Sequence, residues 1–427
     1  MKKQKLIIII ILISTIYLIL LINAFLIKRN NKIKKEFLEA AEYIEVEELN
    51  KLIHKNGVNI NIKDRDNGWT ALMHAVYYKN TEVAIKLIEI GANVNIKNKK
   101  GMTALMYAAW KGYTEITKEL IKAKANLNIK DNKGWTALIY ATKVDHIETA
   151  KELIRAGADI NIQNRYGETA LMYAAYYDYT EIVKELIKAG ADINIRDKYG
   201  NTALIEAAEM GNTKIAKELI EAGANINIQD NNGNTALIEA AENGRIRTVE
   251  ELIKTGADIN IQNKYGETAL MYAARYAAII YSTETTEELI KAGADINIKD
   301  NEGKTALIHA AMYGYTETIE ELIKADADIN IKDNEGKTAL IVAAENGRIR
   351  TVEELIKTGA DINIKDNEGK TALIYTASEG YIGIVEELIK AGADINIKDN
   401  EGKTALDYAE EKGYNKTIKL LSSFNKK

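Results

Sequence analysis

This chain of 427 residues contains no cysteine and no proline. Without cysteine it cannot form disulfides, thiolate metal sites, a catalytic thiol or a cysteine-linked lipid anchor. It also has only four histidines, His54, His74, His146 and His309, and none has the spacing of a metal site or of a nucleophile and its base. We therefore expect no enzymatic activity, no metal and no cofactor.

Positive charge is scarce beyond the first 35 residues. Those residues hold eight lysines and arginines and no acid, whereas residues 36–427 hold 49 basic and 62 acidic side chains. Binding to a nucleic-acid backbone requires clustered basic side chains. The acidic balance therefore argues against nucleic acid as a partner, and no small-molecule ligand is expected.

One long hydrophobic run is present, at residues 6–27, which are 22 consecutive positions without a charge. At about 1.5 Å per residue, such a helix would span about 33 Å, close to the thickness of a bilayer's apolar core. The sequence therefore predicts a single-pass transmembrane anchor at 6–27, between a basic tail at 1–5 and a basic linker at 28–35.

Two other interpretations of this run remain open. A cleaved signal peptide would have a shorter apolar core and a small-x-small site, and the segment Ile22-Asn23-Ala24 begins with a bulky residue. A buried core helix seldom runs so far without a charge.

The side of the membrane on which the rest of the chain lies also stays open. Five basic residues after the run favour a cytoplasmic location for the rest of the chain, whereas the lysines before it favour an outside location.

A period of 33 residues runs through the rest of the chain. Thr-Ala-Leu recurs with this spacing, apart from one step of 37 residues between Thr268 and Thr305. The repeated threonines are Thr70, Thr103, Thr136, Thr169, Thr202, Thr235, Thr268, Thr305, Thr338, Thr371 and Thr404. A fixed period of this length is typical of stacked repeat proteins, which usually present a binding surface.

Residues 366–398 illustrate one period. Asp366-Asn367-Glu368-Gly369 predicts a turn, and Thr371 is placed as the N-cap of a short helix over 372–377 that ends at Gly380. A second helix is expected over 382–391, with apolar residues at helical spacing. Residues 393–397 are then expected to run extended toward the next turn.

This pattern resembles the ankyrin repeat, whose motif is D-x-x-G-x-T-P-L-H-x-A-A followed by G-A-D-V-N. Matching runs occur at 131–141, 197–208, 300–311 and 392–396. The family's proline is alanine here, as at Ala71 and Ala104, and its histidine is Met, Ile or Asp, as at Met73 and Asp407. The resemblance implies an all-α ankyrin-repeat α-solenoid with about 12 helix-turn-helix repeats and β-turn tips over 36–427, here preceded by the transmembrane helix.

In the ankyrin family, partners usually contact the turn tips and the inner helix face. The matching positions in this chain are rich in aromatic residues over the first two-thirds of the repeats. They are Trp69, Tyr77, Tyr78, Trp110, Trp135, Tyr166, Tyr176, Tyr177, Tyr199, Tyr265, Tyr276 and Tyr313. Aromatic residues are enriched among interface hot spots. They can equally fill grooves between repeats, so both interpretations remain.

The sequence therefore predicts a membrane-anchored protein that binds another protein non-covalently. A structural spacer is the alternative, because the C-terminal turns are uniform and residues 240–261 are identical to 343–364. A secreted effector is a third reading, if the leader is cleaved. The 37-residue period, with its extra residues within 275–285, is another local candidate for a functional loop.

Overall fold

The computed structural model describes residues 2–43, 46–56, 58–276 and 283–424. The side chains of residues 2–14, 48, 55 and 56 are outside this description. Over the described residues the fold is all-helical, with 24 helices and a single isolated β-bridge between Lys63 and Thr70. The chain divides into two compact units, residues 1–197 (unit 1) and 198–427 (unit 2).

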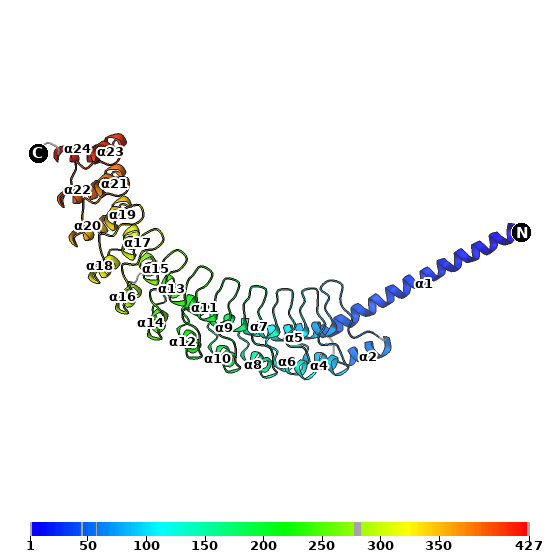
Figure 1. The fold of residues 1–427 in the computed structure, drawn as a ribbon. Coiled ribbons are helices and arrows are strands. Elements are labelled where there is room, and N and C mark those ends of the chain that lie inside the picture. Colours follow the sequence, from blue (N-terminus) through cyan, green and yellow to red (C-terminus); the bar gives the residue numbers. More distant parts are fainter. Residues whose placement is uncertain (1, 44–45, 57, 277–282, 425–427) are drawn as a thin grey trace. The chain divides into compact units, whose positions relative to one another are not determined.

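Each repeat contributes two helices joined by a short loop, and in Figure 1 the first and second helices form separate rows within each unit. Unit 1 contains α1 (Lys2–Tyr43), α2 (Val46–Asn56), α3 (Ala71–Tyr77), α4 (Thr81–Glu89), α5 (Ala104–Lys111), α6 (Thr114–Lys122), α7 (Ala137–Lys143), α8 (Ile147–Arg155), α9 (Ala170–Tyr176) and α10 (Thr180–Lys188). Unit 2 contains α11 (Ala203–Met210), α12 (Thr213–Glu221), α13 (Ala236–Glu242), α14 (Ile246–Lys254), α15 (Ala269–Tyr276), α16 (Glu284–Lys291), α17 (Ala306–Tyr313), α18 (Thr316–Lys324), α19 (Ala339–Glu345), α20 (Ile349–Lys357), α21 (Ala372–Glu379), α22 (Ile382–Lys390), α23 (Ala405–Lys412) and α24 (Asn415–Phe424).

The repeated threonine begins the first helix of each repeat, as predicted. In α21 the hydroxyl oxygen of Thr371 accepts a hydrogen bond from the backbone N–H of Ile374 at 3.4 Å, and Gly380 ends the helix with φ of 74°. The second helix, α22, also follows the prediction. Residues 393–397 differ from it, because they contain a tight turn at 395–396 rather than an extended segment.

Adjacent turns within a unit hydrogen-bond to each other at backbone level. The backbone N–H of Asn367 donates to the carbonyl of Glu335, and its side-chain amide donates to the carbonyl of Asn334, both at 2.9 Å. Gly336 permits this approach, since a Cβ there would lie 2.8 Å from the backbone nitrogen of Asn367. The turns therefore stack in a register that allows no side chain at the glycine.

The core of each unit lies between the two rows of helices. Ala339, Leu340 and Ile341 of the first helix in one repeat are at most 1% exposed, and Val352 and Leu355 of the second helix are fully buried. Small alanines allow first helices of neighbouring repeats, such as α19 and α21, to pack closely. No repeat could bury these residues alone, which explains why the repeats stack.

The predicted transmembrane anchor requires a correction. No described helix combines the length and the apolar character that a bilayer crossing needs. Among residues with described side chains, the uncharged stretch of α1 runs from Thr15 to Ile27, about 20 Å at 1.5 Å per residue. The rest of the expected span, residues 6–14, has no described side chains.

The helix does not end at the expected boundaries either. It continues through Lys28 and Arg29 into the first repeat, where Phe37, Ala40 and Ala41 are fully buried against α3. The prediction of a transmembrane helix, and with it of a single-pass membrane protein, is therefore wrong for the part of the chain that the structure describes.

The extra residues of the 37-residue period are expected within 275–285, which includes the end of α15 and the start of α16. Of its predicted insertion, 275–285, residues 277–282 lie outside the described residues, so its role stays a prediction.

Alanine substitution at two glycines of unit 1 tests whether close stacking of the turns requires glycine. Gly134 and Gly157 both have positive φ, of 83° and 86°, but a Cβ on Gly134 would lie 2.7 Å from the backbone nitrogen of Arg165, whereas nothing lies within 4 Å of one on Gly157. We expect Gly157→Ala to lower the free energy of unfolding by about 1 kcal/mol through strain alone, and Gly134→Ala by about 3 kcal/mol. Urea unfolding followed by circular dichroism measures both, and equal losses would contradict the stacking argument.

Candidate protein-binding surface

Six aromatic rings gather in the first repeats of unit 1. Neighbouring ring centroids lie 4.8 to 6.5 Å apart, at distances typical of favourable aromatic pairs. We call this set the aromatic cluster, and it consists of Tyr43, Trp69, Tyr77, Tyr78, Tyr107 and Trp110. Four of these residues are among the predicted contact residues, which the structure brings together from α3, α5 and the turn before α3.

Sequence reasoning missed two members of the cluster. Tyr43 lies at the end of α1 and is 73% exposed, with its ring 5.2 Å from that of Tyr78. Tyr107 lies four residues after its repeat's threonine and contacts both Trp69 and Tyr77. The period could have revealed Tyr107, because residues 33 apart occupy equivalent positions in neighbouring repeats. Tyr43 precedes the first repeated threonine, Thr70, so the period gives no signal for it.

The other predicted aromatic residues are dispersed. Trp135 contacts Tyr140 and Tyr173, while Tyr176 and Tyr177 pack on each other in the repeat whose first helix begins at Thr169. Tyr166 is exposed at a turn tip of unit 1. In unit 2, Tyr199, Tyr265 and Tyr313 are exposed and Tyr276 is half-buried beside Tyr272. The structure thus brings only part of the predicted set together.

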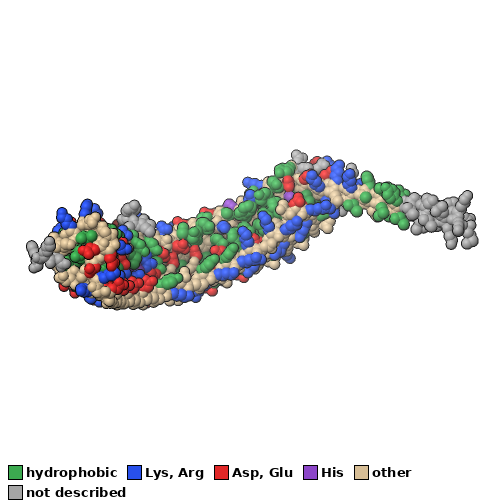
Figure 2. Space-filling model, turned by 90° about the horizontal axis from the view of Figure 1, so that it is seen from above, with side chains coloured by type: hydrophobic (Ala, Val, Ile, Leu, Met, Phe, Trp, Pro, Cys, Tyr) green, Lys and Arg blue, Asp and Glu red, His purple; other side chains and the backbone are tan. Residues whose placement is uncertain are grey.

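Four members of the aromatic cluster line a groove of about 900 Å³. Its walls come from residues 31–42 of α1, the turn before α3 and the turn at 98–100. Trp69, Tyr77, Tyr78 and Tyr107 line it, and basic side chains surround them. The basic residues are Lys34, Lys35, Lys63, Arg65, Lys99 and Lys100. In Figure 2, hydrophobic side chains and lysines or arginines gather on the face formed by unit 1.

His74 contacts an acidic side chain on each of two walls of this groove. Its Nδ1 lies 2.7 Å from a carboxylate oxygen of Glu42 on α1, and its Nε2 lies 3.1 Å from Oδ2 of Asp64 in the turn. The other carboxylate oxygen of Asp64 accepts the backbone N–H groups of Asn67 and Gly68 at 2.7 Å. Burial opposes the effect, but these hydrogen bonds hold the pKa of Asp64 below its usual value. Both carboxylates thus contact the same imidazole ring.

The same position, four residues after the threonine, links helix to turn along both units. Tyr140 donates a hydrogen bond to Asp131 at 2.7 Å, and Tyr375 donates one to Asp366 at 2.7 Å. In the repeat whose first helix begins at Thr235, this position is Glu239, which accepts a hydrogen bond from the side-chain amide of Asn234 at 2.8 Å. These polar side chains hold the turns in place and are therefore structural.

Unit 2 is acidic where unit 1 is aromatic. Glu206 and Glu209 of α11 and Glu239 and Glu242 of α13 occupy the matching positions, and Figure 2 shows acidic side chains on the part formed by unit 2. Burial, together with the nearby charges of Glu242 and Glu209, raises the pKa of Glu239 to about 7. Residues 198–427 hold 27 basic and 39 acidic side chains, whereas residues 36–197 hold 22 and 23.

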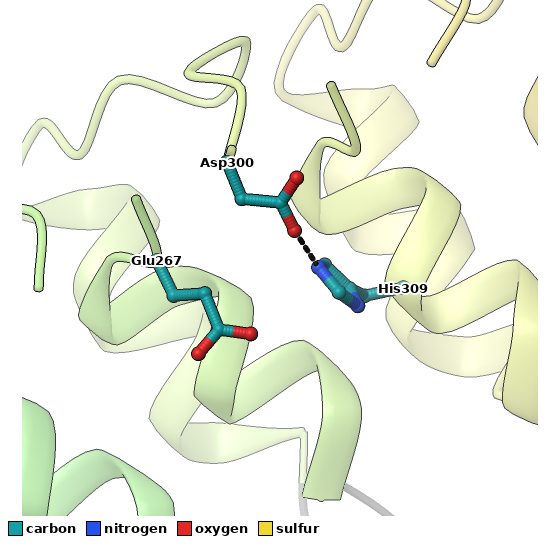
Figure 3. Close-up of side chains that lie close together, drawn as sticks. All are labelled: Glu267, Asp300 and His309. Atoms are coloured by element: carbon teal, nitrogen blue, oxygen red, sulfur yellow. Dashed lines mark hydrogen bonds and ion pairs between the residues drawn. The ribbon is translucent and has the colours of Figure 1, made fainter. Parts of the chain in front are cut away.

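Glu267, Asp300 and His309 converge in unit 2, although no sequence spacing drew attention to them (Figure 3). Nε2 of His309 lies 2.9 Å from Oδ2 of Asp300. The three residues could supply three ligands to a metal ion. However, the guanidinium of Arg275 forms an ion pair with Glu267 and lies 3.3 Å from Nδ1 of His309. A cation is thus already provided by the chain, so we assign no metal to this cluster.

Comparison of the sequence with known protein families agrees with this repeat fold. A family model described as ankyrin repeats (3 copies) matches residues 37–131, 84–164, 112–197, 147–230, 173–263, 204–300, 275–366 and 360–427. The chain belongs to the ankyrin-repeat family. Ankyrin-repeat proteins are generally scaffolds without enzymatic activity, and their repeats suggest protein partners.

One curated relative matches a short stretch of these ankyrin repeats. The inhibitor of Bruton tyrosine kinase from Xenopus laevis is 39% identical over 53 residues, which is 12% of this chain and 4% of that protein. The aligned stretch is shorter than two ankyrin repeats, and the chain spans only a small part of the relative's length.

The raised pKa of Glu239 predicts a pH-dependent stability. An acid whose pKa is higher in the folded state destabilises that state when it ionises, so stability should fall as pH rises from 4.5, its ordinary pKa, to about 7. We expect Glu239→Gln to raise the free energy of unfolding by about 1 kcal/mol at pH 8 and to change it little at pH 4.5. The exposed Glu250→Gln is the control, and a pH-independent effect at Glu239 would contradict the assignment.

The network around Arg275 generates a second test. Arg275→Met should lower the free energy of unfolding by about 3 kcal/mol, because Glu267 then lies partly buried without its counter-ion. Adding Glu267→Gln should recover part of this loss, so the two effects should not be additive. Thermal unfolding measures the cycle. Stabilisation of the unmodified chain by added zinc would instead indicate a metal site.

Proposed function

We propose that this chain binds another protein non-covalently through the aromatic cluster and the groove that it lines. The observation that carries this proposal is the packing of six aromatic rings beside an open groove on the first repeats of the array. Tyrosine and tryptophan are enriched in interface hot spots, because each buries a large area at low cost in conformational entropy.

Membership of the ankyrin-repeat family supports the proposal, since such repeats suggest protein partners. The geometry supports placing the contact in unit 1. Tyr78 and Trp110 are 43% and 38% exposed, although their neighbours in the cluster hold their rings in place. Rings that are both exposed and supported lose little further freedom when a partner covers them.

A structural spacer remains a second candidate for unit 2. The identical segments 240–261 and 343–364 make the same contact, because Nε of Arg245 donates to the carbonyl of Glu209 and Nε of Arg348 donates to that of Met312. Repetition of both sequence and contact is consistent with added length rather than with a tuned surface.

Two variants of the full chain, expressed in the cells that naturally produce the protein, distinguish protein binding from the spacer function. In the first, Tyr77→Ser and Tyr78→Ser remove part of the aromatic cluster, and in the second, residues 333–398 are deleted, which removes two complete periods. Quantitative mass spectrometry measures the amount of partner protein that is cross-linked to each variant. We expect this amount to fall about tenfold for the first variant and to stay unchanged for the second.

The matched control carries Tyr265→Ser and Tyr313→Ser, which remove exposed rings of unit 2. Circular dichroism checks that each variant is folded. Loss of function on deletion, with unchanged partners after the Tyr77 and Tyr78 substitutions, would favour the spacer and contradict the binding proposal.

A further inference from the structure

We infer that the groove of unit 1 accepts an acidic peptide segment that carries an aliphatic or aromatic side chain. This inference rests on the proposed function, because it specifies the partner of the same surface. It follows from three features of the groove, which are an aromatic floor, a basic rim and an excess of basic over acidic side chains among the lining residues.

The floor suits an apolar side chain. Trp69, Tyr77 and Tyr107 pack edge to face or at a tilt, with centroids 4.8 to 5.7 Å apart, and Tyr78 extends the apolar surface toward α1. Their mutual contacts hold the rings in fixed orientations. An aliphatic or aromatic residue placed over them would bury area without requiring the floor to rearrange.

The rim supplies positive charge. Lys34 projects from α1, and Lys99 and Lys100 project from the turn before α5. All three side chains are exposed, and none of them forms an ion pair with a described carboxylate. Nζ of Lys99 instead donates to the backbone carbonyl of Arg65 at 2.6 Å, which holds it at the edge of the groove.

A further cation lies beside the cluster. Nζ of Lys111 lies 4.6 Å from the ring centroid of Tyr77 and 4.8 Å from that of Trp110. It is therefore positioned against the aromatic surface by cation–π contacts. A carboxylate that approaches the rings would meet a charge that is already held in place.

The acids that line the groove offset this rim only in part. Glu42 and Asp64 both contact His74, and Asp64 also accepts two backbone N–H groups. Glu39 lies 3.4 Å from Lys35 on the same helix face. With Asp66, four acids line the groove against six basic side chains, so a partner meets a net positive charge that includes Lys34, Lys99 and Lys100.

Nucleic acid fits this groove less well than a peptide does. A phosphate backbone carries a closely spaced row of negative charges, and Glu39, Glu42, Asp64 and Asp66 line the same groove. Residues 36–197 also hold as many acids as bases, to within one. A peptide can place a few carboxylates at the rim and an uncharged side chain on the floor.

Fluorescence anisotropy with the full chain tests the inference. The probe is a fluorescein-labelled peptide in which glutamates flank a leucine and a phenylalanine. Three competitors accompany it: the same peptide with lysine in place of glutamate, the same peptide with serine in place of leucine and phenylalanine, and single-stranded oligothymidylate. We expect only the acidic, apolar peptide to bind, and its affinity to fall as salt is raised.

The test variants reverse the rim charge. Lys99→Glu with Lys100→Glu should weaken peptide binding by about tenfold or more, and Lys99→Gln with Lys100→Gln should weaken it by less. Lys264→Glu is the matched control, because Lys264 holds the position of Lys99 in the exposed turn before α15 of unit 2. Tyr78→Ser should weaken binding without changing its salt dependence.

Several outcomes would overturn the inference. These are equal binding of the lysine or serine peptide, displacement of the probe by oligothymidylate, and unchanged affinity in the Lys99 and Lys100 variants. If the peptide does not bind while cross-linked partners still depend on Tyr77 and Tyr78, the acidic chemistry is wrong and the proposed function stands. If partners do not depend on those tyrosines either, both fail.

Discussion

The backbone hydrogen bonds between successive turns are the constraint on which the rest of this structure depends. An asparagine in one turn bonds to two carbonyls of the turn before it, as Asn367 does to Glu335 and Asn334. Such contacts require a glycine at the closest approach, and they are kept across the 37-residue period, where Asn301 bonds to the carbonyls of Tyr265 and Lys264. A shift of one residue would break these bonds and also move the apolar residues of both helices out of the core.

This register also produces the surfaces. Because equivalent positions of neighbouring repeats lie side by side, any residue type that recurs there forms a continuous patch within its unit. Aromatic residues at these positions form the cluster of unit 1, and glutamates at the same positions form an acidic patch in unit 2. The helix pairs and turns recur in both units, so these two surfaces differ in their side chains, whereas the groove also requires α1, which only unit 1 contains.

Much of the repeat fold could be predicted from the sequence, since the Thr371 cap, the Gly380 end and the second helix of that repeat are local signals. The N-terminal prediction failed for a different reason. The hydrophobicity of residues 6–27 alone predicts a membrane span, whereas the helix continues into the first repeat through charged residues and buries Phe37 and Ala41. The turn at 395–396 was also missed, because Asp-Ile-Asn-Ile contains none of the glycines that usually mark a turn.

The sequence by itself determined the period, the helix pairs and the residues that face the core, because each of these follows from local propensity and from spacing along the chain. Only the tertiary structure decided which polar and aromatic side chains meet. His74 joins Glu42 to Asp64, Arg275 joins Glu267 to His309, and Tyr43 reaches Tyr78. Such contacts join different repeats or a helix to a turn. They depend on rotamers and on distances of a few ångströms that stacking alone sets, so no single repeat encodes them.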